Sequence, residues 1–297
     1  MPHPPTFATP PGFLGLPIGG KTARFSIAGI PLDIGTTNRP GARFGPAAIR
    51  RASAMLVDGA HPKGRQEPAK GDLADLGDFA VALGELEQSL ALVESQAATV
   101  EHLVALGGDH SVTLALLRAL RKRVDQPLGL VHFDAHVDTW PDSFGQKWGH
   151  GSVFYHAITE GLVDPKRTVQ VGIRSPVDPQ VMRWTLDQGV TVIDAEQVQE
   201  HRPAAIAGEI ATRLDSGPAY LSFDIDALDP AFAPGTGTPE VGGLSTYQAQ
   251  SILRRLGAID FRGMDLMEVS PPYDHAEITA LAAATLVWEY LCVVMAR

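Results

Sequence analysis

The sequence predicts a single three-layer α/β/α domain with a parallel sheet of about eight strands. Near-continuous apolar runs alternate along the chain with amphipathic stretches of helical length. Uninterrupted hydrophobic strands are typical of parallel sheets that are buried on both faces, and the intervening helices supply the covering layers. A chain of 297 residues can bury a large core, and no internal shift in composition indicates a linker.

The expected elements follow one another in a regular order. Strands are expected at 25–30, 72–76, 103–106, 128–133, 169–173, 190–193, 220–223 and 263–266, of which the second is the weakest. Helices are expected at 46–56, 85–100, 113–123, 152–160, 179–188, 204–214, 247–256 and 276–296. Pro46 suits the first turn of its helix, because its missing N–H would have no partner there.

The N-terminal residues differ from the rest of the chain. Residues 1–20 are rich in proline, and we expect an extended arm that is either loose or wrapped around a neighbouring subunit. Residues 21–297 would then form the folded domain. The start of the chain lacks a basic region followed by an apolar core, which indicates no secretory signal and predicts a cytoplasmic protein.

Charge and cysteine content exclude several classes of function. The net charge of −10 argues against nucleic acid as a partner and is compatible with a cationic substrate. No apolar run reaches the length of a membrane span. The one cysteine, Cys292, excludes an intramolecular disulfide and a thiolate metal cluster, and its apolar surroundings predict a core residue.

Carboxylates and histidines gather in four stretches, each just after an expected strand. The stretches are 107–110, 134–138, 224–226 and Glu268. The carboxyl ends of parallel strands meet at one edge of a sheet, so these side chains should converge. In an extended segment Asp134, His136 and Asp138 would point to the same side. Converging carboxylates repel one another and are costly to desolvate, which predicts bound divalent cations.

The predicted metal ligands combine two imidazoles with four carboxylates. They are His110, Asp134, His136, Asp138, Asp224 and Asp226. Oxygen donors favour magnesium or manganese, and imidazole shifts the preference toward transition metals, so manganese satisfies both, with zinc, cobalt or iron as alternatives. Two-metal hydrolytic sites hold their ions about 3.5–4 Å apart and lower the pKa of bound water. A lone Asp-x-His-x-Asp would be equally consistent with a polar loop.

Neighbouring polar residues have more ordinary explanations. Asp109 is expected to cap the helix that starts near Ser111, and Asp229 to initiate a turn. His132 is expected in the core. His150 lies between glycines and is either a proton shuttle or substrate partner, or a histidine of a surface loop. For the histidines in the arm or in polar stretches the ordinary surface role is preferred: His3, His61, His102 and His201.

Four motifs resemble those of the ureohydrolases, the arginase and agmatinase family. They are Gly-Gly-Asp-His-Ser at 107–111, Phe-Asp-Ala-His-Val-Asp-Thr at 133–139, Ser-Phe-Asp-Ile-Asp-Ala-Leu-Asp-Pro at 222–230 and Glu-Val-Ser-Pro-Pro-Tyr-Asp at 268–274. The resemblance extends from residue 39 to the terminal helix. It implies an arginase-like fold, a homo-oligomer (a trimer or hexamer) and a hydrolase that cleaves guanidino groups.

The resemblance also implies roles for the site residues. Two manganese ions per subunit would be held by His110, Asp134, Asp138 and Asp224 and by Asp134, His136, Asp224 and Asp226, with Asp134 and Asp224 bridging. A metal-bridging hydroxide would attack the guanidinium carbon. Glu268 would grip the guanidinium, and Asp138 would pass a proton to the departing amine with the help of His150.

The flanking residues favour agmatine as the substrate. Arginases have a Ser-Gly-Asn stretch before the position of His150, where this chain has Gln-Lys-Trp-Gly at 146–149, and an Asn where it has Trp140. Without these groups an α-carboxylate should bind poorly, which favours hydrolysis of agmatine to putrescine and urea, a step in polyamine biosynthesis. Asp178, Trp140 and Trp148 are candidates for binding the distal ammonium.

Other activities stay open as alternatives. A guanidinobutyrase or guanidinopropionase would share the same metal ligands. A single-zinc deacetylase of the same fold would lack the second-site ligands, which are present here. A catalytically silent relative would have lost ligands.

Overall fold

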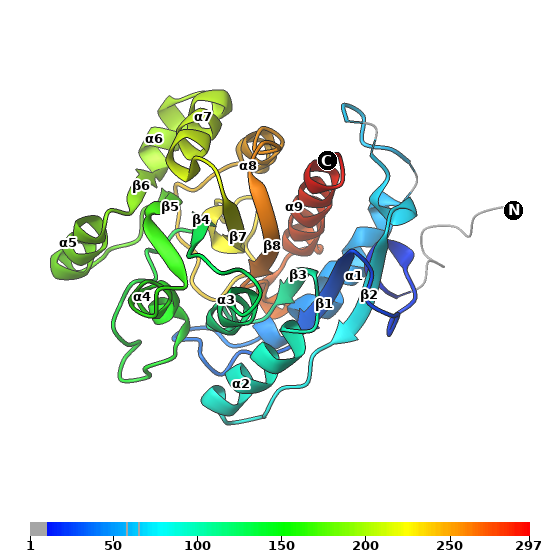
Figure 1. Ribbon diagram of the computed structural model, residues 1–297, viewed down its shortest axis with the longest axis horizontal. Helices are drawn as coiled ribbons and strands as arrows, with labels where there is room; N and C mark the ends of the chain where they lie inside the picture. The colour runs from blue at the N-terminus through cyan, green and yellow to red at the C-terminus, as the bar shows by residue number, and fades with distance from the viewer. Residues whose placement is uncertain (1–10, 58, 65) are drawn as a thin grey trace, which may run out of the picture.

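The computed structural model describes residues 11–57, 59–64 and 66–297, which form three layers (Figure 1). The middle layer consists of β1 (Phe25–Ile30), β2 (Leu73–Asp78), β3 (His102–Gly107), β4 (Leu128–Phe133), β5 (Val163–Ile173), β6 (Thr191–Asp194), β7 (Pro218–Asp224) and β8 (Asp260–Met267). These strands pair in parallel in the order β2-β1-β3-β8-β7-β4-β5-β6. The predicted eight-stranded parallel sheet is confirmed.

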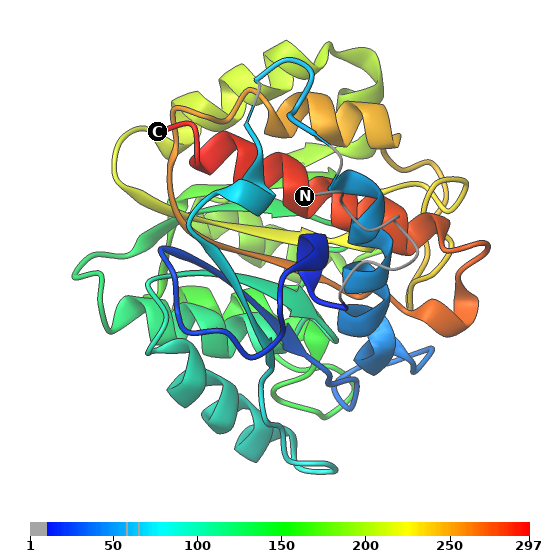
Figure 2. The same cartoon turned by 90° about the vertical axis from the view of Figure 1, so that its right-hand side faces the viewer.

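Helices cover both faces of this sheet. They are α1 (Gly45–Ser53), α2 (Leu86–Ala97), α3 (Val112–Arg121), α4 (Val153–Thr159), α5 (Pro179–Gln188), α6 (Ala195–Glu200), α7 (Pro203–Leu214), α8 (Thr246–Leu253) and α9 (Ile278–Val294). One core packs α1, α6, α7, α8 and α9 against the sheet, and the other packs α2, α3 and α4. Figure 2 shows α9 in red beside α1 in blue, with which it makes extensive contact.

Successive residues along a strand face opposite sides of the sheet and so contribute to the two cores in turn. Val131 and Phe133 of β4 enter the core beneath α7 to α9, whereas Leu128 and Leu130 enter the core beneath α2 to α4. Every residue of β4 is buried, because neighbouring strands and both helical layers enclose it. This double burial explains the uninterrupted apolar runs that predicted the fold.

The structure differs from the expected elements at β5 and at α6. Strand β5 begins at Val163, six positions before the expected residue 169, and its early part is only partly buried. The short helix α6 was not predicted. Its polar sequence lacks an apolar stripe, but Asp194 and Gln197 form a capping box that stabilises its first turn.

The N-terminal segment is packed, so the expectation of an unpacked arm is wrong for its described part. Residues 1–10 of that arm lie outside the described residues. Phe13 and Leu14 are buried. The Phe13 N–H donates to Asp75 Oδ2 at 2.8 Å, and the Leu14 N–H donates to Ser53 Oγ at 2.7 Å. These bonds hold the segment against α1 and β2.

Of the histidines expected in surface positions, His61 is buried and His102 is half-buried. His61 is buried with its Nε2 atom 3.1 Å from Glu289 Oε2. His102 lies with its Nε2 atom 2.8 Å from the Tyr290 hydroxyl, and burial together with Arg24 lowers its pKa to about 4. His201 is exposed, as expected.

The terminal helix contains the single cysteine. Cys292 is buried as predicted, and burial raises the pKa of its thiol to about 12. Among the described helices, none combines the length and the apolar character that a bilayer crossing requires.

We predict that Arg50→Met destabilises the fold far more than Arg51→Met. Arg50 is 5% exposed and donates to both carboxylate oxygens of the fully buried Asp75, at 2.8 and 3.0 Å. Its loss leaves a buried charge unpaired, which should cost about 3–5 kcal/mol in the free energy of unfolding. Arg51 pairs with Glu277 at the surface, where both side chains are more than half exposed, so its loss should cost less than about 1 kcal/mol.

Urea denaturation of both variants measures the difference in the free energy of unfolding. Equal effects of the two substitutions would show that the Arg50–Asp75 pair does not anchor the N-terminal segment.

Candidate metal centre

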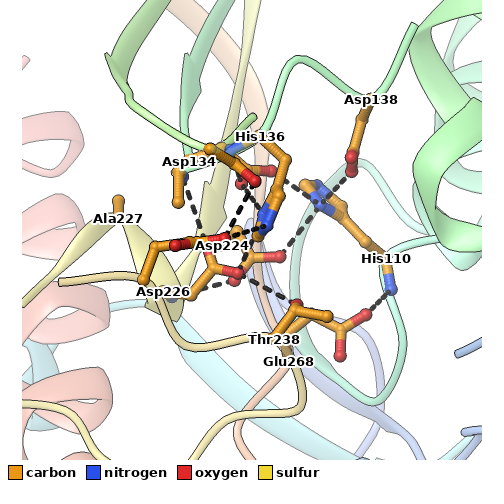
Figure 3. Close-up of polar contacts among 12 residues, drawn as sticks. His110, Asp134, His136, Asp138, Asp224, Asp226, Ala227, Thr238 and Glu268 are labelled. Carbon is orange, nitrogen blue, oxygen red and sulfur yellow. Dashed lines mark hydrogen bonds and ion pairs between the residues drawn. The ribbon is translucent and has the colours of Figure 1, made fainter. Parts of the chain in front are cut away.

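The four stretches singled out in the sequence meet at one edge of the sheet (Figure 3). They follow β3, β8, β7 and β4, which are the four central strands and immediate neighbours in that order. All four strands run in parallel, so their carboxyl ends lie at the same edge. The predicted convergence of the side chains is therefore present.

His110 lies at the centre of the first group of donors. Its Nδ1 atom is 3.4 Å from Asp134 Oδ2, 3.3 Å from Asp138 Oδ2 and 3.3 Å from Asp224 Oδ2. All of these side chains are buried or nearly so. Within the described part of the chain, this nitrogen has no hydrogen-bond partner of good geometry.

A chain of hydrogen bonds fixes which nitrogen of His110 faces the carboxylates. The Ser222 hydroxyl donates to Asp265 Oδ1 at 2.6 Å, so its oxygen accepts the Nε2–H of His110 at 2.8 Å. Asp265 also accepts hydrogen bonds from Thr113 and Tyr220. The Nδ1 lone pair of His110 is therefore free to bind a cation between the three carboxylates.

The second group shares Asp134 with the first. His136 Nδ1 is 3.2 Å from Asp134 Oδ1 and 3.1 Å from Asp226 Oδ2. Asp226 Oδ1 accepts the Ala135 N–H, and its Oδ2 accepts the Thr238 hydroxyl at 3.2 Å. Asp134, His136 and Asp226 offer ligand atoms close enough to hold one ion. The structure thus brings all six predicted metal ligands into two adjoining groups.

The cluster is electrostatically unfavourable without a counter-charge. Burial and the carboxylates of Asp226 and Asp134 raise the pKa of Asp224 well above its usual range. Burial and Asp134 raise that of Asp226. Burial acts in the same direction on Asp134, but its contacts with His132, His110 and His136 outweigh it and lower the pKa. Divalent cations would stabilise the ionised form of every carboxylate, and the nitrogen and oxygen donors fit such ions.

His132 contributes to the site, although the sequence predicted only a core residue. Its Nδ1 accepts from Gln170 Nε2 at 3.2 Å, so its Nε2–H donates to Asp134 Oδ2 at 2.8 Å. Both nitrogens are engaged, which makes His132 an orienting partner of Asp134 and not a ligand. Its position two residues before Asp134 was the available signal.

We expected an extended backbone at these residues, but the structure has turns there. Strand β4 ends at Phe133, and Asp138 has a left-handed φ of 48°. Asp226 belongs to a 3₁₀ turn and not to a strand, and its N–H donates to Asp224 Oδ1 at 2.9 Å. The side chains converge because tight turns direct them inward.

Glu268 and His150 lie side by side next to the first group. Glu268 is fully buried with a left-handed φ of 64°. Its Oε1 accepts the His110 N–H at 2.8 Å and lies 3.1 Å from His150 Nδ1. Its Oε2 is buried and has no hydrogen-bond partner among the described residues. Glu268 therefore keeps one carboxylate oxygen available for a ligand.

His150 is buried, so the alternative of a surface-loop histidine is wrong. Burial alone would lower its pKa, but the hydrogen bond and charge of Glu268 outweigh this effect and raise the pKa to about 9. Its Nε2 lies 2.8 Å from the Thr37 hydroxyl. The Nδ1–H of His150 is placed to donate to Glu268, and the Thr37 backbone N–H donates toward Nε2 at 3.2 Å.

Other predicted residues have structural partners. Asp109 accepts from the Ser111 N–H at 3.0 Å and the Gly35 N–H at 2.9 Å, which stabilises the turn before α3. Asp229 accepts from Ala231, Gly242 and Gly243, as its predicted turn role requires.

The candidates for binding the substrate tail lie on loops. Asp178 is exposed and caps α5 by accepting the Gln180 N–H at 2.7 Å. Trp140 is half-buried, and its backbone N–H donates to Gly151 O. Trp148 packs against His156, with Arg118 and Lys147 over its ring. These contacts give Trp148 a packing role.

The chain as a whole is similar to several known proteins. A model of the arginase family matches residues 23–292. An agmatinase of Cronobacter sakazakii is 43% identical over 96% of this chain and 94% of its own. A guanidinopropionase of Pseudomonas aeruginosa is 44% identical over 97% and 92%. The solved structure of proclavaminate amidino hydrolase from Streptomyces clavuligerus matches 99% of both chains with a TM-score of 0.94 and 36% identity.

We predict that Asp134→Asn removes both bound metal ions, because Asp134 contributes one carboxylate oxygen to each group. Asp226→Asn should remove only the ion held with His136. Elemental analysis after manganese loading and desalting gives the metal content per chain. Asp178→Asn is the matched control, since asparagine also caps helices. Two ions retained by Asp134→Asn would contradict its bridging role.

Proposed function

The chain belongs to the arginase family, and from that premise we propose that it hydrolyses the guanidino C–N bond of agmatine to give putrescine and urea. Membership over nearly the whole chain makes it an arginase-family hydrolase. The observation that supports a guanidino substrate is the free Oε2 of Glu268 beside two groups of metal-binding side chains.

Glu268 has the properties that a guanidinium site needs. A planar cation with several N–H donors pairs best with a carboxylate oxygen that is already desolvated and held in place. The His110 N–H and His150 fix Oε1, which leaves Oε2 as the acceptor. The left-handed backbone of Glu268 is stabilised by its N–H donating to Gly108 O at 2.9 Å. The substrate therefore meets an ordered acceptor.

Two manganese ions are the cofactor that we propose for the six ligands. When bound, such ions supply a nucleophilic water of lowered pKa near neutral pH. The protein contributes the orientation of the ligands through Asp265 and His132, and it buries every donor except His136, whose side chain is partly exposed. Asp138 is the ligand nearest the loop of His150, and we assign to it the transfer of a proton to the departing amine.

His150 would assist that transfer as a proton donor. Glu268 raises its pKa to about 9, so the imidazole stays protonated at neutral pH. Its contact with Thr37 fixes the ring.

Agmatine is the substrate that we favour within the class. The loops around the cluster offer the carboxylate of Asp178 and the indole of Trp140, which suit a distal ammonium. A guanidino acid is the second candidate, because the guanidinopropionase relative is as similar to this chain as the agmatinase relative. A single-zinc deacetylase is disfavoured because the second group is complete.

We predict that manganese-loaded protein releases urea from agmatine faster than from arginine, 4-guanidinobutyrate or 3-guanidinopropionate. A colorimetric urea assay at equal substrate concentrations measures kcat/KM for each compound. Faster turnover of a guanidino acid would overturn agmatine as the substrate and keep the reaction class. Absence of urea from all four compounds would overturn the class.

We also predict that Glu268→Gln lowers kcat/KM roughly a hundred-fold or more while both metal ions stay bound. The substitution keeps the shape of the side chain but removes the charge that pairs with a guanidinium, and breaking a buried pair of this kind costs about 2–5 kcal/mol. Glu209→Gln, on the exposed face of α7, is the control. Full activity in Glu268→Gln would exclude Glu268 as the guanidinium acceptor.

A further inference from the structure

Arg174 fastens the loop that follows β7 to the end of β5. Its guanidinium donates to Asp226 O at 2.7 Å, Glu240 O at 2.6 Å and Val241 O at 3.1 Å. The first carbonyl lies at the start of the loop and the other two lie near its end. A single side chain therefore fixes the spacing between the ligand Asp226 and the segment at 240–241.

The loop held in this way presents a carboxylate to the second group of donors. Glu240 Oε1 accepts the Ser175 hydroxyl at 2.9 Å and lies 4.0 Å from His136 Nε2. Ser175 directly follows Arg174, so the same turn fixes both the backbone and the carboxylate of Glu240. The side chain of Glu240 is 34% exposed, at the outer edge of the cluster.

The orientation of His136 gives this carboxylate a role. His136 Nδ1 faces Asp134 and Asp226, so a cation would be bound there and the remaining proton would lie on Nε2. A carboxylate oxygen, Glu240 Oε1, lies 4.0 Å from that Nε2. A carboxylate behind a metal-binding histidine fixes the ring and makes the ligating nitrogen a stronger donor. A separation of 4.0 Å can be bridged by one water or closed by a small rotation of the side chain.

We propose that Glu240, held by Arg174 and Ser175, is a positioning residue for the second cation and acts through His136. The inference rests on the proposed two-metal function. The proposal predicts that loss of Glu240 weakens the affinity for the ion held by His136 and Asp226. The affinity for the ion at His110 should not change, because the described contacts of Glu240 reach only the second group.

The test is a calorimetric titration of metal-free protein with Mn²⁺, which gives a dissociation constant for each of two ions. We expect Glu240→Ala to weaken binding of the second ion about ten- to a hundred-fold and to leave the first ion within about two-fold. Glu240→Gln keeps an acceptor for His136 without the charge, so it should restore part of the loss. Glu209→Gln is the control.

Electron paramagnetic resonance supplies a second readout that does not depend on activity. At two equivalents of Mn²⁺ the native protein should show a spin-coupled pair, and Glu240→Ala should show mainly an isolated ion. Unchanged second-site affinity in Glu240→Ala would overturn the inference, and so would equal weakening of both sites. A native protein that binds only one ion would instead overturn the two-metal basis of the proposed function.

Discussion

Three carboxylates approach one imidazole nitrogen, His110 Nδ1, at 3.3–3.4 Å, and the surrounding structure is arranged to make this possible. Buried carboxylates repel one another, so each needs a partner that orients it. Cations must balance the negative charge of the cluster. His132 orients Asp134, and the Ser222–Asp265 chain orients His110. These supporting residues lie inside strands β4, β7 and β8, so the sheet itself sets the geometry of the site.

The rigid inner cluster contrasts with the loops that surround it. The cluster is buried except for part of His136 and is built on the four central strands, whereas Glu240, Asp178 and Trp140 lie on connections at its rim. Arg174 joins the two regions, since it binds the carbonyl of Asp226 on the inside and that of Glu240 on the outside. This link fixes the backbone that carries Glu240 relative to the adjoining ligand Asp226.

The sequence predicted the layers, the strand ends and the convergence of six acidic and histidine side chains, because apolar runs and polar residues after them are local patterns. It did not predict that β3, β8, β7 and β4 are neighbours, since their order in space differs from their order in the chain. Asp265 was missed because its partners, Ser222 and Thr113, are distant in sequence. The packing of Phe13 was missed because it depends on the buried carboxylate of Asp75.

The same division between cluster and loops explains why substrate is harder to infer than reaction class. Relatives named for agmatine and for guanidinopropionate are 43% and 44% identical to this chain, so overall identity does not separate them. The residues that would bind the metals and the guanidinium are fixed by the sheet and should be common to both. The substrate tail would instead meet residues on loops outside the strands. Differences at a few rim positions, such as Asp178 and Trp140, can therefore change the preferred tail while the chemistry stays the same.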